Sequence, residues 1–191
     1  MGNKRNKIKY NLKNVHFAKL TETEEGKITF ATPVPITGAV SMSMEAQGEI
    51  SPFYADGIVY YKTAANNGYE GDVELAILPE SFLTDILGET LDSKKVLIEN
   101  AEAQQAAFAL LFEFDGDTKA IRHVLYNCAA TRPSIESQTK EETVEPVTEK
   151  LTISATPLPD GRIKAKTGDE TDEVTYNNWY KTVYETPVEE A

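Results

Sequence analysis

Few side chains in this 191-residue sequence have the type and spacing that catalysis or metal binding requires. The two histidines, His16 and His123, lie far apart in the sequence, and neither has a partner at metal-ligand spacing. Cys128 is the only cysteine, so it cannot form an intrachain disulfide, and no thiol-nucleophile signature flanks it. Phosphate-binding glycine loops, dinucleotide fingerprints and Gly-x-Ser-x-Gly elbows are also absent from the sequence. The sequence therefore predicts a non-enzymatic protein with no catalytic residue, no metal and no cofactor.

Two further groups of residues have a chemical and a structural interpretation. Asp115 and Asp117 flank a glycine and could contact calcium, but the remaining oxygen ligands that calcium needs are missing, so we interpret this segment as a hairpin turn. Tyrosines cluster between residues 54 and 69, where they could stack on bases. Aromatic residues in strands usually pack on the pleated surface, and we predict that role for this cluster.

Charge is distributed unevenly along the chain. Residues 1–20 contain six basic side chains and no acidic one, while the remainder holds all 31 acidic residues against 13 basic ones. A body this acidic repels phosphates, so nucleic acid is a weaker partner for the basic end than the acidic body of another copy. We see no secretory signal after the basic start and no apolar run long enough to cross a membrane, which predicts a soluble protein made in a cytoplasm-like setting.

The elements that would position these residues centre on residues 71–130. A strand pattern is followed by Pro79 and by apolar residues at helical spacing up to Gly88, which predicts one short helix at about 79–87. Residues 106–130 then form a predicted hairpin that is apolar on both faces. Both faces of such a hairpin must be covered, either by the chain's own second layer or by a neighbouring subunit.

The rest of the chain is more polar and reads as arms, turns and loops. Asp56-Gly57 and Asn67-Gly68 predict tight hairpin turns. We divide the chain into a basic N-terminal arm (1–13), a single β-rich domain (14–185) with a long loop at 134–149, and an acidic C-terminal tail (186–191). The predicted fold is mainly β, a β-sandwich or barrel-like domain with one flanking helix.

Three stretches resemble the phi13-type major tail proteins, the tail tube proteins of long-tailed phages. They are KYNLKNVHFAKLTE at residues 9–22, the segment from ALLFEFDGD to LTISATP at residues 109–157, and NNWYKTVYE at residues 177–185. The resemblance implies a structural virion protein that forms hexameric rings, which stack into the tube through which the genome passes into the host cell. It also implies tape measure, tail terminator and tail initiator proteins as partners, DNA that passes without specific binding, no membrane association, and assembly in the host cytoplasm.

From this resemblance and the charge pattern we predict where subunits touch. The candidate residues come from the basic arm, the long loop and the aromatic C-terminal motif: Lys4, Arg5, Lys7, Lys9, Thr139, Lys140, Glu141, Glu142, Val144, Trp179 and Tyr180. We further hypothesise that some of the acidic runs face the lumen and repel DNA; these runs are Glu141-Glu142, Asp169-Glu170 and Asp172-Glu173. The alternatives are a β-sandwich binding module, such as an adhesin or carbohydrate-binding domain that contacts its ligand through tyrosines, and a single-ring head–tail or decoration protein.

Overall fold

The computed structural model describes residues 5–139 and 146–187, and it is mainly β with two short helices, as the sequence predicts for the fold class. The helices are α1 (Glu80–Asp85) and α2 (Glu173–Asn178). The strands are β1 (Lys9–Glu22), β2 (Ile28–Phe30), β3 (Val34–Pro35), β4 (Ala39–Gln47), β5 (Ile50–Ala55), β6 (Ile58–Ala64), β7 (Gly68–Leu75), β8 (Thr90–Leu91), β9 (Leu97–Ile98), β10 (Phe108–Gly116), β11 (Ile121–Ala130), β12 (Glu149–Thr156) and β13 (Lys164–Lys166).

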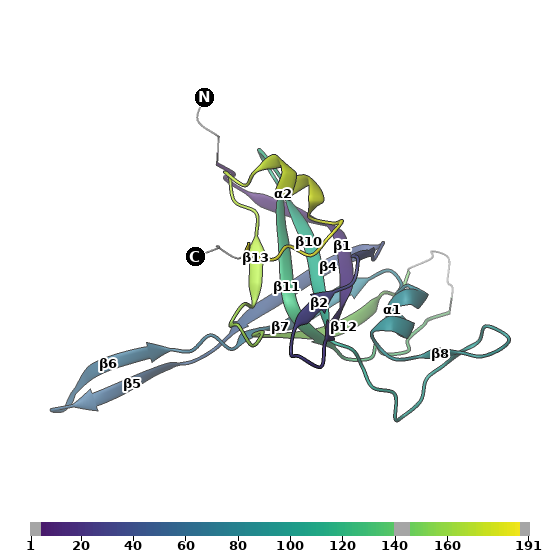
Figure 1. Ribbon diagram of the computed structural model, residues 1–191, viewed down its shortest axis with the longest axis horizontal. Helices are drawn as coiled ribbons and strands as arrows, with labels where there is room; N and C mark the ends of the chain where they lie inside the picture. Colours follow the sequence, from purple (N-terminus) through teal and green to yellow (C-terminus); the bar gives the residue numbers. More distant parts are fainter. Residues whose placement is uncertain (1–4, 140–145, 188–191) are drawn as a thin grey trace.

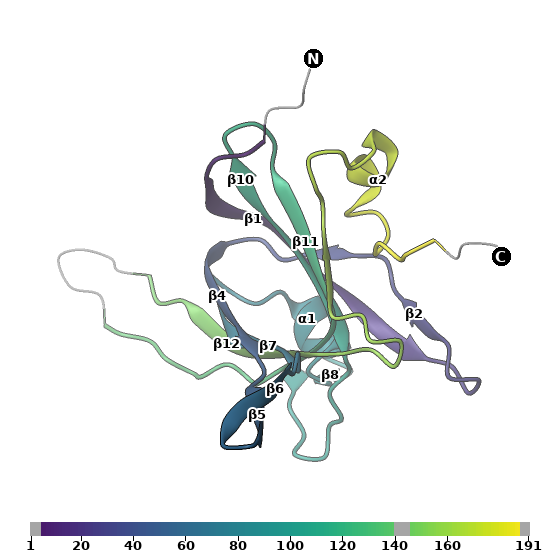
Figure 2. The same cartoon turned by 90° about the vertical axis from the view of Figure 1, so that its left-hand side faces the viewer.

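One antiparallel sheet of nine strands forms the body. Its order is β2-β1-β10-β11-β12-β7-β4, with β3 paired to β1 and β13 paired to β11. Strands β1, β10 and β11 stand upright while β12, β7 and β4 run across below them, so the sheet is strongly bent (Figures 1 and 2). Strand β4 comes close to β1, but the two do not pair within the described residues, and the sheet stays open.

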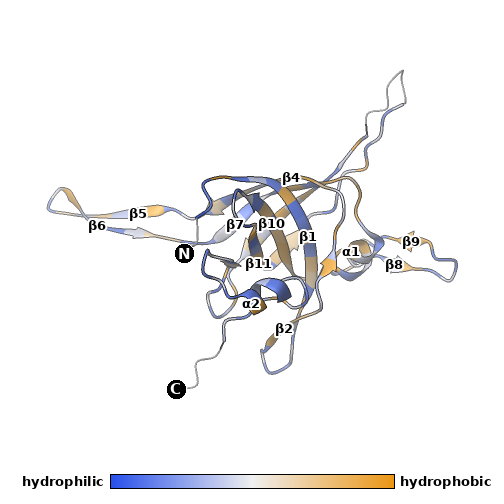
Figure 3. Cartoon of the chain, turned by 90° about the horizontal axis from the view of Figure 1, so that it is seen from above, coloured by the Kyte–Doolittle hydropathy of each residue, from blue (hydrophilic) through white to orange (hydrophobic). Residues whose placement is uncertain are grey.

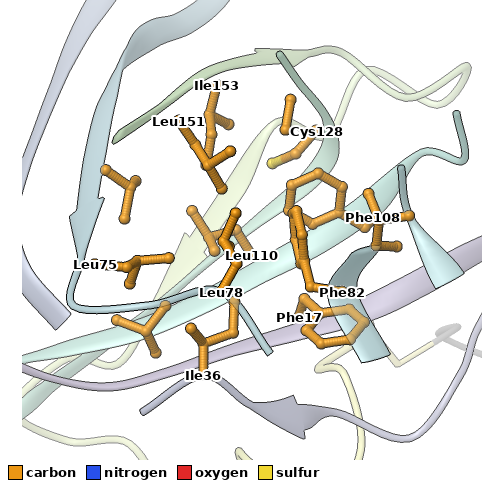
Figure 4. Close-up of a cluster of buried hydrophobic side chains, with 14 of the residues drawn as sticks. Phe17, Ile36, Leu75, Leu78, Phe82, Phe108, Leu110, Cys128, Leu151 and Ile153 are labelled. Carbon is orange, nitrogen blue, oxygen red and sulfur yellow. The ribbon is translucent and has the colours of Figure 1, made fainter. Parts of the chain in front are cut away.

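The concave side of the sheet holds the larger core. Alternation along β10 places Phe108, Leu110 and Phe112 in this core, where they meet residues of β7 and β12 such as Leu75 and Leu151 (Figure 4). Helix α1 closes one side of the core. Its Phe82 is fully buried, with ring centroids 5.1 Å from Phe17 and 5.4 Å from Phe108, in edge-to-face contact. The predicted helix is thus confirmed, within two residues at each end.

The opposite face of β10 and β11 is covered by the chain itself. Ala109, Leu111, Val124 and Tyr126 form a second core with Leu158, which follows β12, and with Trp179 and Val183, which follow α2. Helix α2 is capped by Asp172, whose carboxylate accepts a hydrogen bond from the Thr175 backbone N–H at 2.9 Å. The prediction of a single helix was therefore incomplete, and the two-faced apolar hairpin is covered within one subunit.

The N-terminal residues are attached to the body more closely than the predicted arm implies. Strand β1 begins at Lys9 and pairs with β10 from there, so residues 9–13 belong to the sheet. Just before it, Asn6 accepts hydrogen bonds from the backbone N–H groups of Thr118 and Lys119 and donates one to the Lys119 carbonyl. Residues 5–13 thus lie along the β10–β11 hairpin.

The long loop is irregular wherever it is described. Residues 131–139 and 146–148 have no regular structure, and β12 begins at Glu149, inside the range predicted as loop. Of the candidate contact residues, Lys4, Lys140, Glu141, Glu142 and Val144 lie outside the described residues. The division into arm, domain and tail stays a prediction.

Burial of Cys128 leads to a testable prediction. The side chain is fully buried in the larger core, and this burial raises the pKa of its thiol to about 12. We expect the thiol of the folded protein not to react with Ellman's reagent at pH 8, and to react fully in urea. The variant Ile58→Cys, with a thiol added on an exposed strand, provides the control and reacts at once at one site per chain. Rapid modification of Cys128 in native protein contradicts the packing described here.

Candidate assembly surfaces

The β5–β6 hairpin (residues 50–64) extends away from the body as an isolated ribbon (Figures 1 and 3). Asp56 and Gly57 at its tip have φ angles of 52° and 77°, as the predicted tight turn requires. Yet its apolar side chains face solvent: Phe53 is 61% exposed, Tyr60 70% and Tyr61 62%. A two-stranded ribbon is marginally stable in water, so these exposed apolar side chains form a candidate contact surface.

This hairpin corrects the interpretation of the tyrosine cluster. Only Tyr69, on β7, is partly buried against the body, whereas Tyr54, Tyr60 and Tyr61 are exposed. Packing on the domain's own surface was therefore wrong for three of the four. The predicted hairpin turn at Asn67-Gly68 was also wrong, because β6 and β7 do not pair and Gly68 lies where β7 passes the Ala155 carbonyl, too close for a Cβ atom.

A second apolar surface lies at the other end of the molecule, between α1, the β8–β9 hairpin and the ends of the long loop. Here a hollow of about 370 Å³ is lined by the exposed side chains of Ile77, Ile135 and Val147 and by the charged residues Glu99, Arg132 and Glu136. We call it the distal hollow. The Arg132 Nε atom lies 2.7 Å from Glu99 Oε1, close enough for an ion pair but not aligned for a hydrogen bond. Its Nη2 atom is buried without a hydrogen-bond partner among the described residues.

A third surface is the solvent-facing side of β4, β7 and β12, which is acidic. Glu45 lies opposite Glu70 across β4 and β7, and Asp72 and Glu74 follow on the same face. Like charges directly opposite each other destabilise a sheet, so Glu45 and Glu70 add nothing to the stability of the isolated subunit.

Two of these carboxylates are held in the ionised form. Hydrogen bonding to Lys150, 2.8 Å away, and to Thr152 lowers the pKa of Asp72. Hydrogen bonds from Thr148 and Ser41 likewise lower the pKa of Glu74. This face therefore keeps its negative charge at neutral pH and below.

The acidic runs at residues 169–170 and 172–173 lie away from this face, and each has a local partner; the run Glu141-Glu142 lies outside the described residues. Asp172 caps α2, and Asp169 forms an exposed ion pair with Arg5 at 3.6 Å. Sequence reasoning did not identify the acidic face formed by Glu45, Glu70, Asp72 and Glu74. Alternation along a strand does not indicate which polar faces of neighbouring strands combine into one solvent-exposed surface.

The remaining candidate contact residues are spread over the subunit. Arg5, Lys7 and Lys9 lie near the β10–β11 turn: the Lys7 backbone N–H donates to Asp117, and the Lys9 ammonium lies 5.2 Å from the centre of the Phe114 ring. Thr139 is exposed in the long loop. Trp179 is only 3% exposed, packs in the second core and donates from its Nε1 to the His123 carbonyl.

Tyr180 takes part in a buried polar network that joins the first strand to the last helix. At its centre Glu113, 5% exposed, accepts hydrogen bonds from Arg122 Nε at 3.0 Å, Asn14 Nδ2 at 2.7 Å and the Tyr180 hydroxyl at 3.1 Å. The Arg122 guanidinium also donates to the Tyr176 carbonyl and lies against its ring. Burial and the nearby Glu113 charge raise the pKa of Tyr180. Trp179 and Tyr180 therefore hold the subunit together, a role that their place in a terminal motif did not reveal.

His123 makes the stability of this region depend on pH. Its ring stacks on Phe112 at 5.0 Å, and burial together with Lys166, Lys164 and Lys9 lowers its pKa from 6.5 to about 4. The folded protein therefore binds fewer protons than the unfolded chain below pH 6.5. The stability from the neutral ring is complete above that pH and is lost as the pH falls towards 4.

The variant His123→Phe keeps the aromatic stacking but cannot titrate. Between pH 7.5 and pH 5 we expect its free energy of unfolding to fall by about 1–2 kcal/mol less than that of the wild type, a range that allows for the partial exposure of the ring. Urea unfolding followed by Trp179 fluorescence measures the difference. Both proteins retain His16, whose pKa burial also lowers, so the comparison isolates His123. If the free energies of unfolding of the two proteins change equally with pH, His123 does not cause the pH dependence.

Within the described residues, no helix is long and apolar enough to span a membrane. Among those same residues, no cluster of three or more histidine, cysteine or acidic side chains has the geometry of a metal site.

Comparison with known proteins identifies a family. The family model described as phage tail tube protein matches residues 3–186. A search of curated protein sequences gave no match. Solved structures of similar shape include a sheath/tube terminator of an extracellular contractile injection system, with 10% identity, coverage of 81% of this chain and 94% of that one, and a TM-score of 0.43. The tube-terminating cap of the anti-feeding prophage has 12% identity, coverage of 84% and 93%, and a TM-score of 0.44.

Similarities this low in identity and TM-score carry no argument about function. The family match is different, since it spans nearly the whole sequence and agrees with the resemblance carried by residues 9–22, 109–157 and 177–185. This mainly β chain therefore belongs to the phage tail tube protein family, and it is a structural tail protein.

Proposed function

We propose that this protein forms hexameric rings that stack into the hollow tail tube, through which the phage genome passes into the host cell. One observation beyond the family match carries the proposal: an apolar hairpin extends from a well-packed body and adds no side chain to either of its cores. Strands β5 and β6 pair with each other and with no other strand among those described, so the cost of exposing Phe53, Tyr54, Tyr60 and Tyr61 is recovered only in an assembly.

The acidic face of β4, β7 and β12 is our candidate for the lumen wall. A wall of Glu45, Glu70, Asp72 and Glu74 repels DNA phosphates, so that DNA can move along the tube without binding. Repeated around a ring, the face adds a negative field that the single Lys150 does not balance. Tape measure, tail initiator and tail terminator proteins would limit the tube at its ends, with assembly in the host cytoplasm and the mature location in the virion tail.

Electron microscopy of the purified protein tests the proposal, alone and with an initiator complex. We expect hollow tubes with six-fold cross-sections. Isolated single rings favour a head–tail or decoration protein. A protein that stays monomeric with the initiator present and binds glycans through the β5–β6 tyrosines is a binding module, and the tube proposal then fails.

Charge reversal tests the lumen assignment. We expect tubes of the variant Glu45→Lys/Glu70→Lys to retain a short DNA duplex at low salt and release it as salt increases, because lysines in the lumen attract phosphates. Wild-type tubes should retain none. The exposed pair Glu24→Lys/Glu25→Lys, in the turn between β1 and β2, serves as the matched control. If both variants bind DNA equally, the face does not line the lumen.

A further inference from the structure

We propose that the β5–β6 hairpin of one copy docks in the distal hollow of the next copy. The inference rests on the proposed function only in taking a second copy of this chain as the partner. It adds the surface that receives the hairpin, which the family assignment does not specify.

The distribution of exposed apolar side chains provides the first argument. Seventeen large hydrophobic side chains are exposed among the described residues, and thirteen of them lie in two places. Seven are on the hairpin: Ile50, Phe53, Tyr54, Ile58, Val59, Tyr60 and Tyr61. Six line the distal hollow or the adjoining β8–β9 hairpin: Ile77, Leu91, Val96, Ile98, Ile135 and Val147. A subunit with two concentrated apolar surfaces and few others is suited to one repeated contact.

The positions of the two surfaces provide the second argument. Figure 1 and Figure 3 both place the β5–β6 hairpin at one end of the molecule and α1 with the β8–β9 hairpin at the other. The hairpin therefore cannot reach the hollow of its own chain. A contact between different surfaces of identical copies is head-to-tail, and it extends without limit unless a rotation closes it. Such a contact suits subunits of successive rings.

Polar chemistry provides the third argument. The hollow is bordered by Glu89, Glu99 and Glu136, against which the hairpin offers Lys62 and its tyrosine hydroxyls. The Arg132 side chain is 32% exposed at the hollow, and the hairpin can offer its exposed part acceptors, because the outer edges of β5 and β6 carry carbonyls that pair with no strand in the described residues.

Cysteine cross-linking of the full chain tests the pairing. In a Cys128→Ala background, Ile58→Cys places a thiol beside the hairpin tip and Ile135→Cys places one at the hollow. Mild oxidation of the double variant should give a ladder of disulfide-linked oligomers, and an equimolar mixture of the two single variants should give linked dimers. The control pairs Ile58→Cys with Val174→Cys, which is also exposed but lies on α2. We expect about tenfold more linked product than in the control, because docking raises the effective concentration of the thiols.

Two outcomes separate this inference from the proposed function. Hollow tubes by electron microscopy without Ile58–Ile135 cross-links overturn the docking while the tube remains. A cross-linked ladder without tubes supports the docking and counts against the stacked rings. Equal cross-linking in the test and control pairs also overturns the docking, since it reflects random collision.

Discussion

Replacing the exposed aromatics of the β5–β6 hairpin by serine is expected to abolish tube formation while leaving the folded subunit intact. The variant changes Phe53, Tyr54, Tyr60 and Tyr61, none of which belongs to either core. Buried aromatic anchors at an interface each contribute on the order of 2 kcal/mol, so losing four weakens association by roughly a thousandfold or more, even if the effects are not additive.

Sedimentation and electron microscopy measure assembly, and thermal unfolding measures the fold. We expect the melting temperature to stay within a few degrees of wild type, because the hairpin packs on itself. The control changes two exposed apolar residues elsewhere, Val40→Ser and Val174→Ser, and should still assemble. Tubes formed by the hairpin variant at wild-type concentration exclude the hairpin as an assembly element.

The largest effect on stability is expected from Arg122→Ala. The change leaves the buried Glu113 carboxylate without its cation and removes the contacts that attach Tyr176 to the sheet. Breaking a buried ion pair in this way costs about 3–5 kcal/mol. Urea unfolding monitored by Trp179 fluorescence measures the loss, since this single tryptophan packs beside the network.

A matched arginine provides the control. Arg5 forms an ion pair with Asp169, but its side chain is 89% exposed, and Arg5→Ala should cost less than about 1 kcal/mol. The double variant Glu113→Leu/Arg122→Met removes both charges and should recover part of the loss. If Arg122→Ala costs no more than Arg5→Ala, the network does not hold the C-terminal segment.

The core and its helix could be predicted from the sequence because local patterns determine them. Helical spacing after Pro79 located α1, and the first Asp-Gly pair located the turn at residues 56–57. The turn predicted at residues 115–117 lies slightly later, at residues 117–120, because β10 continues to Gly116. The apolar run of residues 106–112 correctly indicated a strand buried on both faces. What covers the second face depends on a contact between residues more than 50 positions apart, such as Tyr126 and Tyr184, and no local pattern contains that information.

The assembly surfaces escaped prediction for a related reason. An apolar strand such as β6 has the same sequence pattern whether its side chains pack on the domain or project into solvent. Only tertiary structure separates Tyr69, which packs on the body, from Tyr60 and Tyr61, which do not. Charge was similarly ambiguous: the acidic pairs next to each other in sequence became a helix cap and an ion pair, while the acidic sheet face was assembled from separate strands.

The second core also sets an order in which the subunit can be completed. Trp179 and Val183 are translated after the strands that they cover, and the Glu113 network joins β1 to a segment made more than 150 residues later. During synthesis the outer face of β10 and β11 therefore stays uncovered until the ribosome has passed this segment. A chain truncated before α2 leaves that apolar face in contact with solvent, and it is therefore more susceptible to proteolysis and aggregation.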